Sequence, residues 1–142
     1  MTQVTMSRTL AAPADRVWRA LTDPTALAAW FWPQRFAPTA EVDLRVGGRY
    51  RIDGPAVGMA ASGEYLTVEP PTKLVFTWRW DGEPDETLVT IELTPVPTGT
   101  ELALRHERFS DDATRDNHAQ GWRDCLNRLP DYLANQSPNR ER

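Results

Sequence analysis

Short segments in which apolar and polar residues alternate fill most of the chain between residues 40 and 109. Glycine or proline pairs, such as Gly47-Gly48 and Pro70-Pro71, separate them. Alternation with a period of two is typical of strands that bury one face, and such pairs mark turns. The pattern predicts six consecutive strands, at residues 40–46, 49–53, 62–69, 73–80, 87–94 and 100–109. Residues 2–10 alternate in the same way and predict a seventh strand at the start of the chain.

These strands each present one apolar and one largely polar face. Leu74, Phe76 and Trp78 share a face with Trp80, whereas Val75, Thr77 and Arg79 occupy the other. Consecutive strands joined by short turns pair antiparallel, and an antiparallel sheet buries one face only. The apolar face therefore needs a cover from elsewhere in the chain.

The predicted helices provide that cover. Pro13 suits the first turn of a short helix, and Asp23-Pro24 gives a second one a carboxylate cap followed by proline. Residues 111–133 form the long helical pattern, capped by Ser110 or Asp111. Its apolar side runs at spacings of three and four through His118, Trp122, Cys125, Leu126, Leu129 and Leu133. The order predicts an α+β fold in which a seven-stranded antiparallel sheet is covered by one long C-terminal helix, with two short helices after the first strand.

Length and charge narrow the function. A chain of 142 residues is the size of one domain, and its net charge of −4 disfavours a nucleic-acid partner, which would need a basic face. The single cysteine, Cys125, excludes an internal disulfide framework. No secretory signal and no apolar stretch long enough to span a membrane is found, so a reducing cytoplasm is the expected location.

Aromatic residues are the first candidates for function. The chain has six tryptophans, and Trp30, Phe76, Trp78, Trp80 and Trp122 are expected to converge on one interior. Two interpretations stay open: plain core packing, and a cavity wall on which a planar apolar ligand stacks.

The two histidines and one glutamate are candidates for chemistry. His106 on the last strand and His118 on the helix are expected to meet, either as acid–base groups or as a core and a surface histidine. Glu64 would point inward with Leu66 and Val68 and pair with Arg49 or Arg51. Alternatively, a bulge near Gly63 turns Glu64 to solvent.

Other motifs point away from catalysis. Cys125 lies on the buried stripe and is expected to be inert, and Gly121 in mid-helix predicts a close approach of helix and sheet. Two histidines without a third ligand do not form a metal site. No nucleotide-binding or nucleophile motif is found, so no cofactor is expected and the catalytic residues stay unknown.

Motifs spread along the chain resemble those of a known group of proteins. Trp18-Arg19-Ala20-Leu21-Thr22-Asp23-Pro24, Gly47-Gly48-Arg49-Tyr50, Leu74-Val75-Phe76-Thr77-Trp78 and Gly121-Trp122 occur in the expected order. The chain resembles the START-like (SRPBCC) superfamily. Within it, the chain is similar to stand-alone bacterial proteins related to the C-terminal domain of the activator of heat-shock-protein-90 ATPase.

This resemblance implies a helix-grip fold with a cavity between sheet and helix for apolar or amphipathic small molecules. It implies one START-like domain over residues 1–134, followed by a frayed polar tail at 135–142, and a bacterial protein linked to the stress response. It implies no shared catalytic set. The expected ligand-binding residues are Trp30, Arg49, Met59, Glu64, Phe76, Trp78, His106, His118 and Trp122.

The first functional hypothesis is a binding protein for a polyketide, flavonoid or lipid-like ligand. The second is a cyclase, hydrolase or isomerase that uses His106 and Glu64, and an enzyme is the less favoured of these two. The third is a co-chaperone-like interaction module with a chaperone partner. A homodimer through a sheet edge also stays open.

Overall fold

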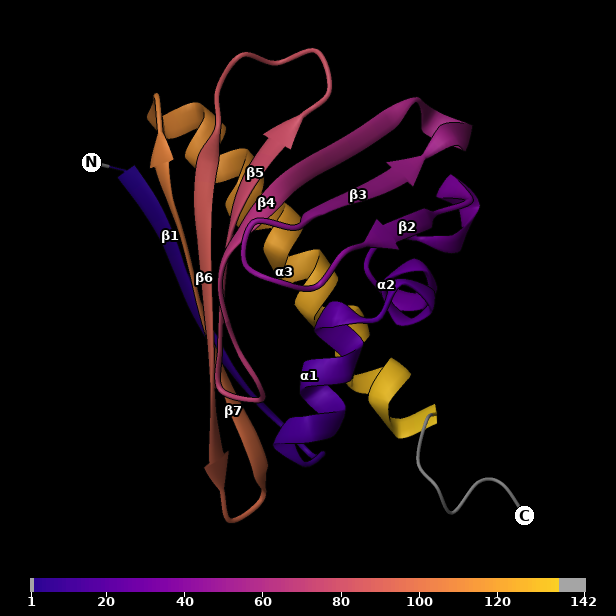
Figure 1. Cartoon of the computed structure of the whole chain (residues 1–142), viewed down its shortest axis with the longest axis vertical. Helices are drawn as coiled ribbons and strands as arrows, with labels where there is room; N and C mark the ends of the chain where they lie inside the picture. The colour runs from indigo at the N-terminus through magenta and orange to yellow at the C-terminus, as the bar shows by residue number, and fades with distance from the viewer. Residues whose placement is uncertain (1, 136–142) are drawn as a thin grey trace.

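The computed structural model describes residues 2–135, which form an α+β fold (Figure 1). It contains the predicted seven strands, two short helices and one long helix. In chain order these elements are β1 (Thr2–Leu10), α1 (Ala14–Thr22), α2 (Pro24–Trp30), the 3-10 turn η1 (Gln34–Phe36), β2 (Thr39–Val42), β3 (Arg49–Gly54), the 3-10 turn η2 (Pro55–Val57), β4 (Met59–Glu69), β5 (Lys73–Trp80), β6 (Thr87–Val96), β7 (Gly99–Phe109) and α3 (Asp112–Asn135).

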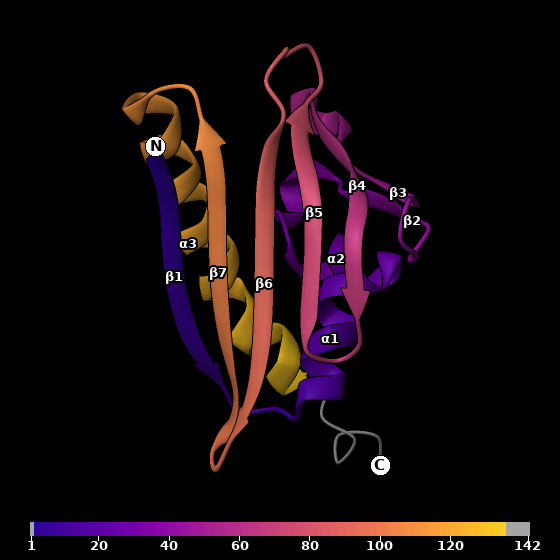
Figure 2. The ribbon, with the colours of Figure 1, turned by 60° about the vertical axis from the view of Figure 1, so that its left-hand side comes forward.

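All strands belong to one antiparallel sheet with the order β1-β7-β6-β5-β4-β3-β2. The last six strands pair in sequence, and β1 pairs with β7, so the first and last strands lie side by side. The sheet bends around α3, which lies behind it when the outer face is viewed (Figure 2). This arrangement confirms the predicted grip of the sheet on the C-terminal helix.

Several strand boundaries differ from the prediction because the adjoining turns are longer or shorter than expected. The strand predicted at 40–46 ends at Val42, because residues 43–48 form a tight turn in which Gly48 N–H donates to the Arg45 carbonyl. Strand β4 begins at Met59, earlier than predicted. The turn predicted at 95–99 is shorter, since Val96 still pairs with Gly99.

Polar caps start the helices at the predicted places. The Asp23 carboxylate accepts a 2.9 Å hydrogen bond from Ala26 N–H at the start of α2. Asp111 accepts a 2.7 Å bond from Thr114 N–H at the start of α3, and these bonds lower the pKa of the Asp111 carboxyl. Pro13, predicted within the first turn of α1, is instead its N-cap residue.

One hydrophobic core fills the space between the sheet and the helices. The buried residues of α3 are those of the predicted stripe from Trp122 onward: Trp122, Cys125, Leu126, Leu129 and Leu133. Asn135, predicted to start a frayed tail, is the last helical residue, and residues 136–142 lie outside the described part of the chain. Within the described part, no helix is long and apolar enough to cross a membrane.

Two glycines have opposite surroundings. A Cβ on Gly63 would lie 1.8 Å from the Thr77 carbonyl oxygen, so only glycine fits where β4 crosses β5. A Cβ on Gly121 would meet nothing within 4 Å. The predicted close approach of helix and sheet at Gly121 is therefore wrong, because this position faces outward from α3.

Candidate functional site

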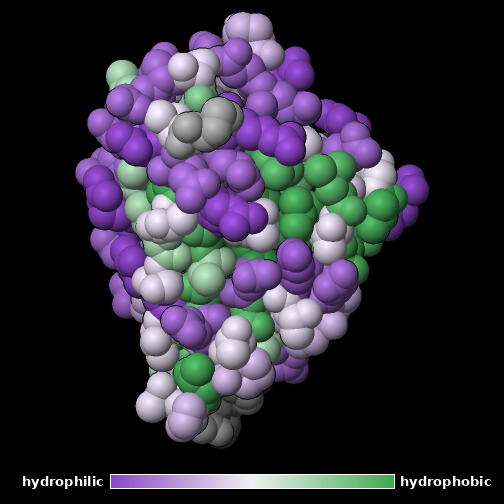
Figure 3. Space-filling view, turned by 90° about the vertical axis from the view of Figure 1, so that its left-hand side faces the viewer, coloured by the Kyte–Doolittle hydropathy of each residue, from purple (hydrophilic) through white to green (hydrophobic). Residues whose placement is uncertain are grey.

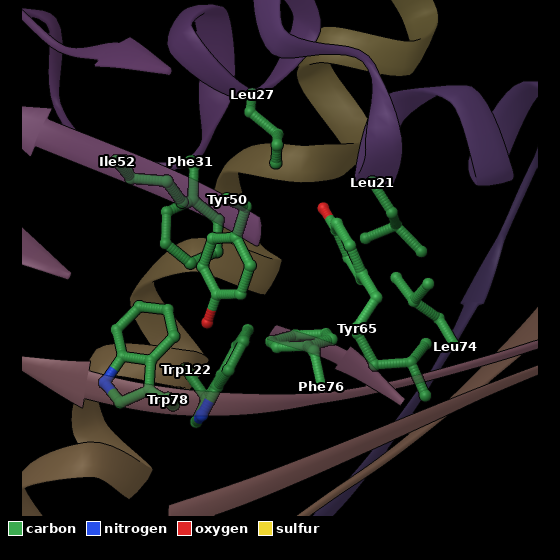
Figure 4. A pocket seen from close by; sticks show the side chains of 11 residues that line it. Leu21, Leu27, Phe31, Tyr50, Ile52, Tyr65, Leu74, Phe76, Trp78 and Trp122 are labelled. Carbon is green, nitrogen blue, oxygen red and sulfur yellow. The ribbon is translucent and has the colours of Figure 1, made fainter. Parts of the chain in front are cut away.

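A small apolar cavity lies between the sheet, α2 and α3 (Figure 4). Its volume of about 30 Å³ is room for one or two water molecules, far below the 300–1,000 Å³ of typical ligand pockets. It is lined by Leu21, Leu27, Phe31, Tyr50, Ile52, Tyr65, Leu74, Phe76, Trp78, Ile91 and Trp122. Most of the aromatic interior is thus packed core.

A larger groove of about 590 Å³ opens beside this cavity. Three parts of the chain form it: the segment 31–36 after α2, the start of β4 with the end of β5, and the middle of α3. Its lining residues are Phe31, Trp32, Pro33, Arg35, Phe36, Met59, Trp78, Trp80, Asn117, His118, Gly121, Trp122, Asp124, Cys125 and Arg128. Phe31, Trp78 and Trp122 line both spaces and form the wall between them.

Stacked indoles form one side of the groove. The rings of Trp32 and Trp80 are nearly parallel, with centroids 5.9 Å apart and an interplanar angle of 5°. Trp78 meets Trp80 edge to face at 5.3 Å, and Phe36 lies 6.2 Å from Trp32. Such surfaces favour planar apolar molecules, because ring faces and edges pair through their quadrupoles.

Arg128 on α3 holds segment 31–36 in place. Its guanidinium donates to the Trp30 carbonyl at 3.1 Å and to the Phe31 carbonyl at 2.7 Å, where α2 ends with unpaired carbonyl groups. The Cys125 thiol donates to the Phe31 carbonyl at 3.0 Å. Burial raises the pKa of this thiol to about 12, which keeps it protonated and inert as predicted.

His118 links the helix to the sheet at the edge of the groove. Its Nε2 accepts a 2.9 Å hydrogen bond from Trp80 Nε1–H, so the ring proton resides on Nδ1 and is donated to the Thr114 carbonyl at 2.8 Å. A second hollow of about 360 Å³ lies across this link. The hollow is lined by three acidic residues, Asp81, Glu83 and Asp85. The groove is lined by two arginines, Arg35 and Arg128, and by one acidic residue, Asp124.

His106 is sealed in the core with an exposed fraction of 0%. Its Nδ1 accepts from Trp122 Nε1–H at 2.9 Å, so its Nε2–H donates to Thr87 Oγ1 at 2.7 Å. Burial, together with the nearby His118, lowers its pKa to about 3. Both nitrogens are occupied, and His106 lines none of the described pockets, which makes it a satisfied core histidine.

The two histidines meet as expected, with ring centroids 5.2 Å apart. Phe109 contacts both rings, at 4.5 Å from His106 and 4.8 Å from His118. Only His118 borders open space. The pair is therefore a packing contact with one accessible member.

Glu64 and Arg49 lie on the other side of the sheet. They are cross-strand partners on β3 and β4, and Glu64 N–H donates to Thr77 Oγ1 on the polar face of β5. The inward orientation required Leu66 to turn in with Glu64, but Leu66 is 43% exposed and Tyr65 is buried instead. A register shift lies between Tyr65 and Thr67, beyond the position expected from Gly63.

The remaining expected residues divide between groove and core. Met59, Trp78, His118 and Trp122 line the groove, and Phe76 lines only the small cavity. Trp30 is 2% exposed and donates its indole N–H to the Ala20 carbonyl at 2.8 Å, so it is core. A metal-binding group of three or more suitable side chains is absent from residues 2–135.

Sequence reasoning missed Phe31, Trp32, Phe36 and Arg128 as site residues. Phe31-Trp32-Pro33 follows the second short helix and ends in a proline that stops it. Adjacent aromatic residues directly after a helix that must end were a usable signal, because they indicate a segment that packs against the rest of the fold. Arg128 carried no signal, since one exposed-looking arginine on a helix is ordinary.

An antiparallel sheet that grips one long C-terminal helix is the fold of the START-like class of proteins. The chain belongs to the family of activator of Hsp90 ATPase homolog 1-like proteins, whose sequence profile matches residues 11–134.

Solved structures agree with this assignment. A protein from Chromobacterium violaceum is 33% identical over 92% of this chain and 96% of its own, with a TM-score of 0.80. A protein of the dynemicin biosynthetic locus is 28% identical over 96% of this chain and 48% of its own, with a TM-score of 0.82. An Hsp90 activator from Plasmodium falciparum shares the fold at 24% identity over 94% of this chain and 97% of its own, with a TM-score of 0.76. A search of curated proteins gives no match.

Proposed function

We propose that this protein binds a planar, largely apolar small molecule in the groove between α3 and segment 31–36. The observation that carries the proposal is the stacked pair Trp32 and Trp80 on the wall of a groove of about 590 Å³. That volume lies within the range of small-molecule sites, and aromatic walls with a few polar groups are their usual lining.

The groove, and not the interior cavity, is the proposed site. A tricyclic aromatic molecule cannot enter about 30 Å³ without repacking the core. The charged and polar side chains at the groove are those of Arg35, Asn117, His118, Asp124 and Arg128. They suit a ligand with an apolar body and a few oxygen substituents, such as an aromatic polyketide or a flavonoid. A protein similar to this chain comes from the dynemicin biosynthetic locus, which supports a ligand from small-molecule biosynthesis.

Thermal unfolding in the presence of such compounds tests the proposal. A ligand at 100 times its dissociation constant stabilises the native state by about 2.7 kcal/mol, and its midpoint rises accordingly. Stacking on Trp32 and Trp80 should also quench tryptophan fluorescence. A panel of polyketides, flavonoids, fatty acids and aromatic lactones that raises no midpoint and quenches no fluorescence would refute the proposal.

A substitution in the groove localises the binding. Gly121→Leu places a large side chain at the groove, and a Cβ at this exposed helical position meets nothing within 4 Å. We expect it to weaken binding at least tenfold. Asn127→Leu, at an exposed position of α3 outside the groove, is the matched control and should bind normally. Equal affinities of the two variants would place the ligand elsewhere.

The enzyme hypothesis based on His106 and Glu64 lacks its geometry. The two residues lie on strands β7 and β4, which β6 and β5 separate, and they face opposite sides of the sheet. Neither lines the groove. Proton transfer needs both groups within hydrogen-bond reach of one substrate, so we do not assign them catalytic roles.

A co-chaperone-like interaction is the second candidate, and an exposed apolar patch favours it. Leu44, Val46 and Leu66 are 37%, 64% and 43% exposed. Gly47 N–H donates to the Tyr65 carbonyl, which brings the turn carrying Val46 beside β4 near Leu66. Figure 3, a view onto the outer side of the sheet, shows hydrophobic side chains gathered at one side among hydrophilic ones.

The ATPase rate of Hsp90 from the same cell tests this second candidate. Stimulation that is lost in Val46→Asp but kept in Gly121→Leu would assign the patch to a chaperone partner. If neither the rate nor co-purification responds to the protein, the co-chaperone hypothesis fails.

A further inference from the structure

Trp78 carries an unsatisfied hydrogen-bond donor in the middle of the molecule. The residue is 5% exposed, and its indole Nε1–H is buried without a partner. No other buried side-chain nitrogen or oxygen within residues 2–135 lacks a partner. Leaving such a group unpaired is costly, so an unpaired donor in a folded protein requires an explanation.

The position of Trp78 provides one. It lines the small cavity, the groove and the acidic hollow, and it is the one residue that all three share. In Figure 4 it lies beside Trp122 at one end of the small cavity. The other indoles around it have partners: Trp80 donates to His118, and Trp122 donates to His106. Trp78 alone among these three offers a free donor.

We infer that the ligand carries a carbonyl or phenolate oxygen on its ring system, which accepts a hydrogen bond from Trp78 Nε1–H. This inference rests on the proposed function and names the chemical class that the groove selects. A planar hydrocarbon of the same size would stack on Trp32 and Trp80 equally well but would leave the donor unpaired.

Selectivity follows from that difference. A ligand with an acceptor gains one hydrogen bond that an apolar analogue cannot make, because the donor stays unpaired when the analogue binds. The nitrogen is covered in this structure, so an acceptor reaches it only when a neighbouring side chain of the groove wall moves aside.

Fluorenone and fluorene are a matched pair of probes, since both are planar tricyclic molecules and only fluorenone has a carbonyl oxygen. We expect the wild-type protein to bind fluorenone about three- to tenfold more tightly, as one added hydrogen bond predicts. In ¹H–¹⁵N spectra, the indole N–H signal of Trp78 should move downfield with fluorenone and not with fluorene. This readout needs no variant beyond Trp78→Phe, which assigns the signal.

Trp78→Phe removes the donor and keeps an aromatic ring. Its fluorenone-to-fluorene affinity ratio should fall to about one, while Asn127→Leu, at an exposed position outside the groove, should keep the wild-type ratio. Equal binding of both probes by the wild type would overturn the inference and leave the proposed function standing. Binding of neither probe, nor of any compound in the wider panel, would refute both.

Discussion

Trp122 Nε1–H donates a 2.9 Å hydrogen bond to His106 Nδ1 and fixes the tautomer of a histidine that no solvent reaches. The chain continues through His106 Nε2–H to Thr87 Oγ1, and the Thr87 hydroxyl donates to the Trp78 carbonyl at 3.1 Å. The direction of every bond is set by the indole, which can only donate. These bonds connect α3 to β7, β6 and β5 across the core.

The neutral state of His106 makes stability depend on pH. Its pKa falls from 6.5 to about 3 on folding, so the unfolded chain binds more protons between these values. The contribution to stability is complete above pH 6.5 and is lost as the pH falls toward 3, by about 1.4 kcal/mol per pH unit. Urea unfolding between pH 6.5 and 5 measures this slope, above the range where most carboxylates titrate.

Variants separate the two histidines in that measurement. His106→Gln removes the titrating group and should flatten the slope, whereas His118→Gln should retain most of it. If His106→Gln has the same pH dependence as the wild type, the slope comes from other groups and the assignment is wrong.

Trp122→Phe should destabilise the protein by more than the loss of one ordinary hydrogen bond. It leaves His106 Nδ1 buried without a donor, which costs about 1–3 kcal/mol. Urea unfolding at pH 7 measures the change. Trp32→Phe is the control, because the Trp32 indole N–H makes no hydrogen bond within residues 2–135. Equal losses in both variants would contradict the special role of this bond.

Arg128→Met should loosen segment 31–36 and the groove with it. The variant loses two charge-assisted bonds to the carbonyls of Trp30 and Phe31, each worth about 1.5–3 kcal/mol. Arg128→Lys keeps the charge but cannot span both carbonyls, so it should restore only part of the stability. Hydrogen exchange at residues 31–36 is the direct measurement. Unchanged protection there in Arg128→Met would show that the aromatic residues hold the segment without the arginine.

Glycine positions 63 and 121 should respond to alanine in opposite ways. Gly63→Ala forces a Cβ against the Thr77 carbonyl and should destabilise the protein by several kcal/mol, as backbone overlap cannot relax by a side-chain turn. Gly121→Ala adds a methyl group in open space on a helix and should stabilise it by about 1 kcal/mol. Thermal midpoints of the two variants check both signs at once.

The alternation of residues along the chain determined the fold. Strands 73–80 and 2–10 were predicted with correct ends, because their apolar positions repeat every two residues and turn residues flank them. The stripe of α3 was predicted for the same reason, from spacings of three and four. Periodicity is a local property, so it can be read without knowing what each face packs against.

The tertiary structure alone decided which candidates form a site. His106 and His118 were both candidates for chemistry, yet the first is sealed between Trp122 and Thr87 and the second borders the groove. A register shift after Tyr65 changes which residues of β4 share a face, so Glu64 faces outward. No glycine marks this shift in the sequence, so the sequence did not predict its position. The size of a cavity depends on how closely a helix packs on a sheet, which many side chains fix jointly. Local sequence thus determines each strand or helix by itself. A groove wall made of Trp32 and Trp80, which are 48 positions apart in the sequence, exists only once the sheet has closed around the helix.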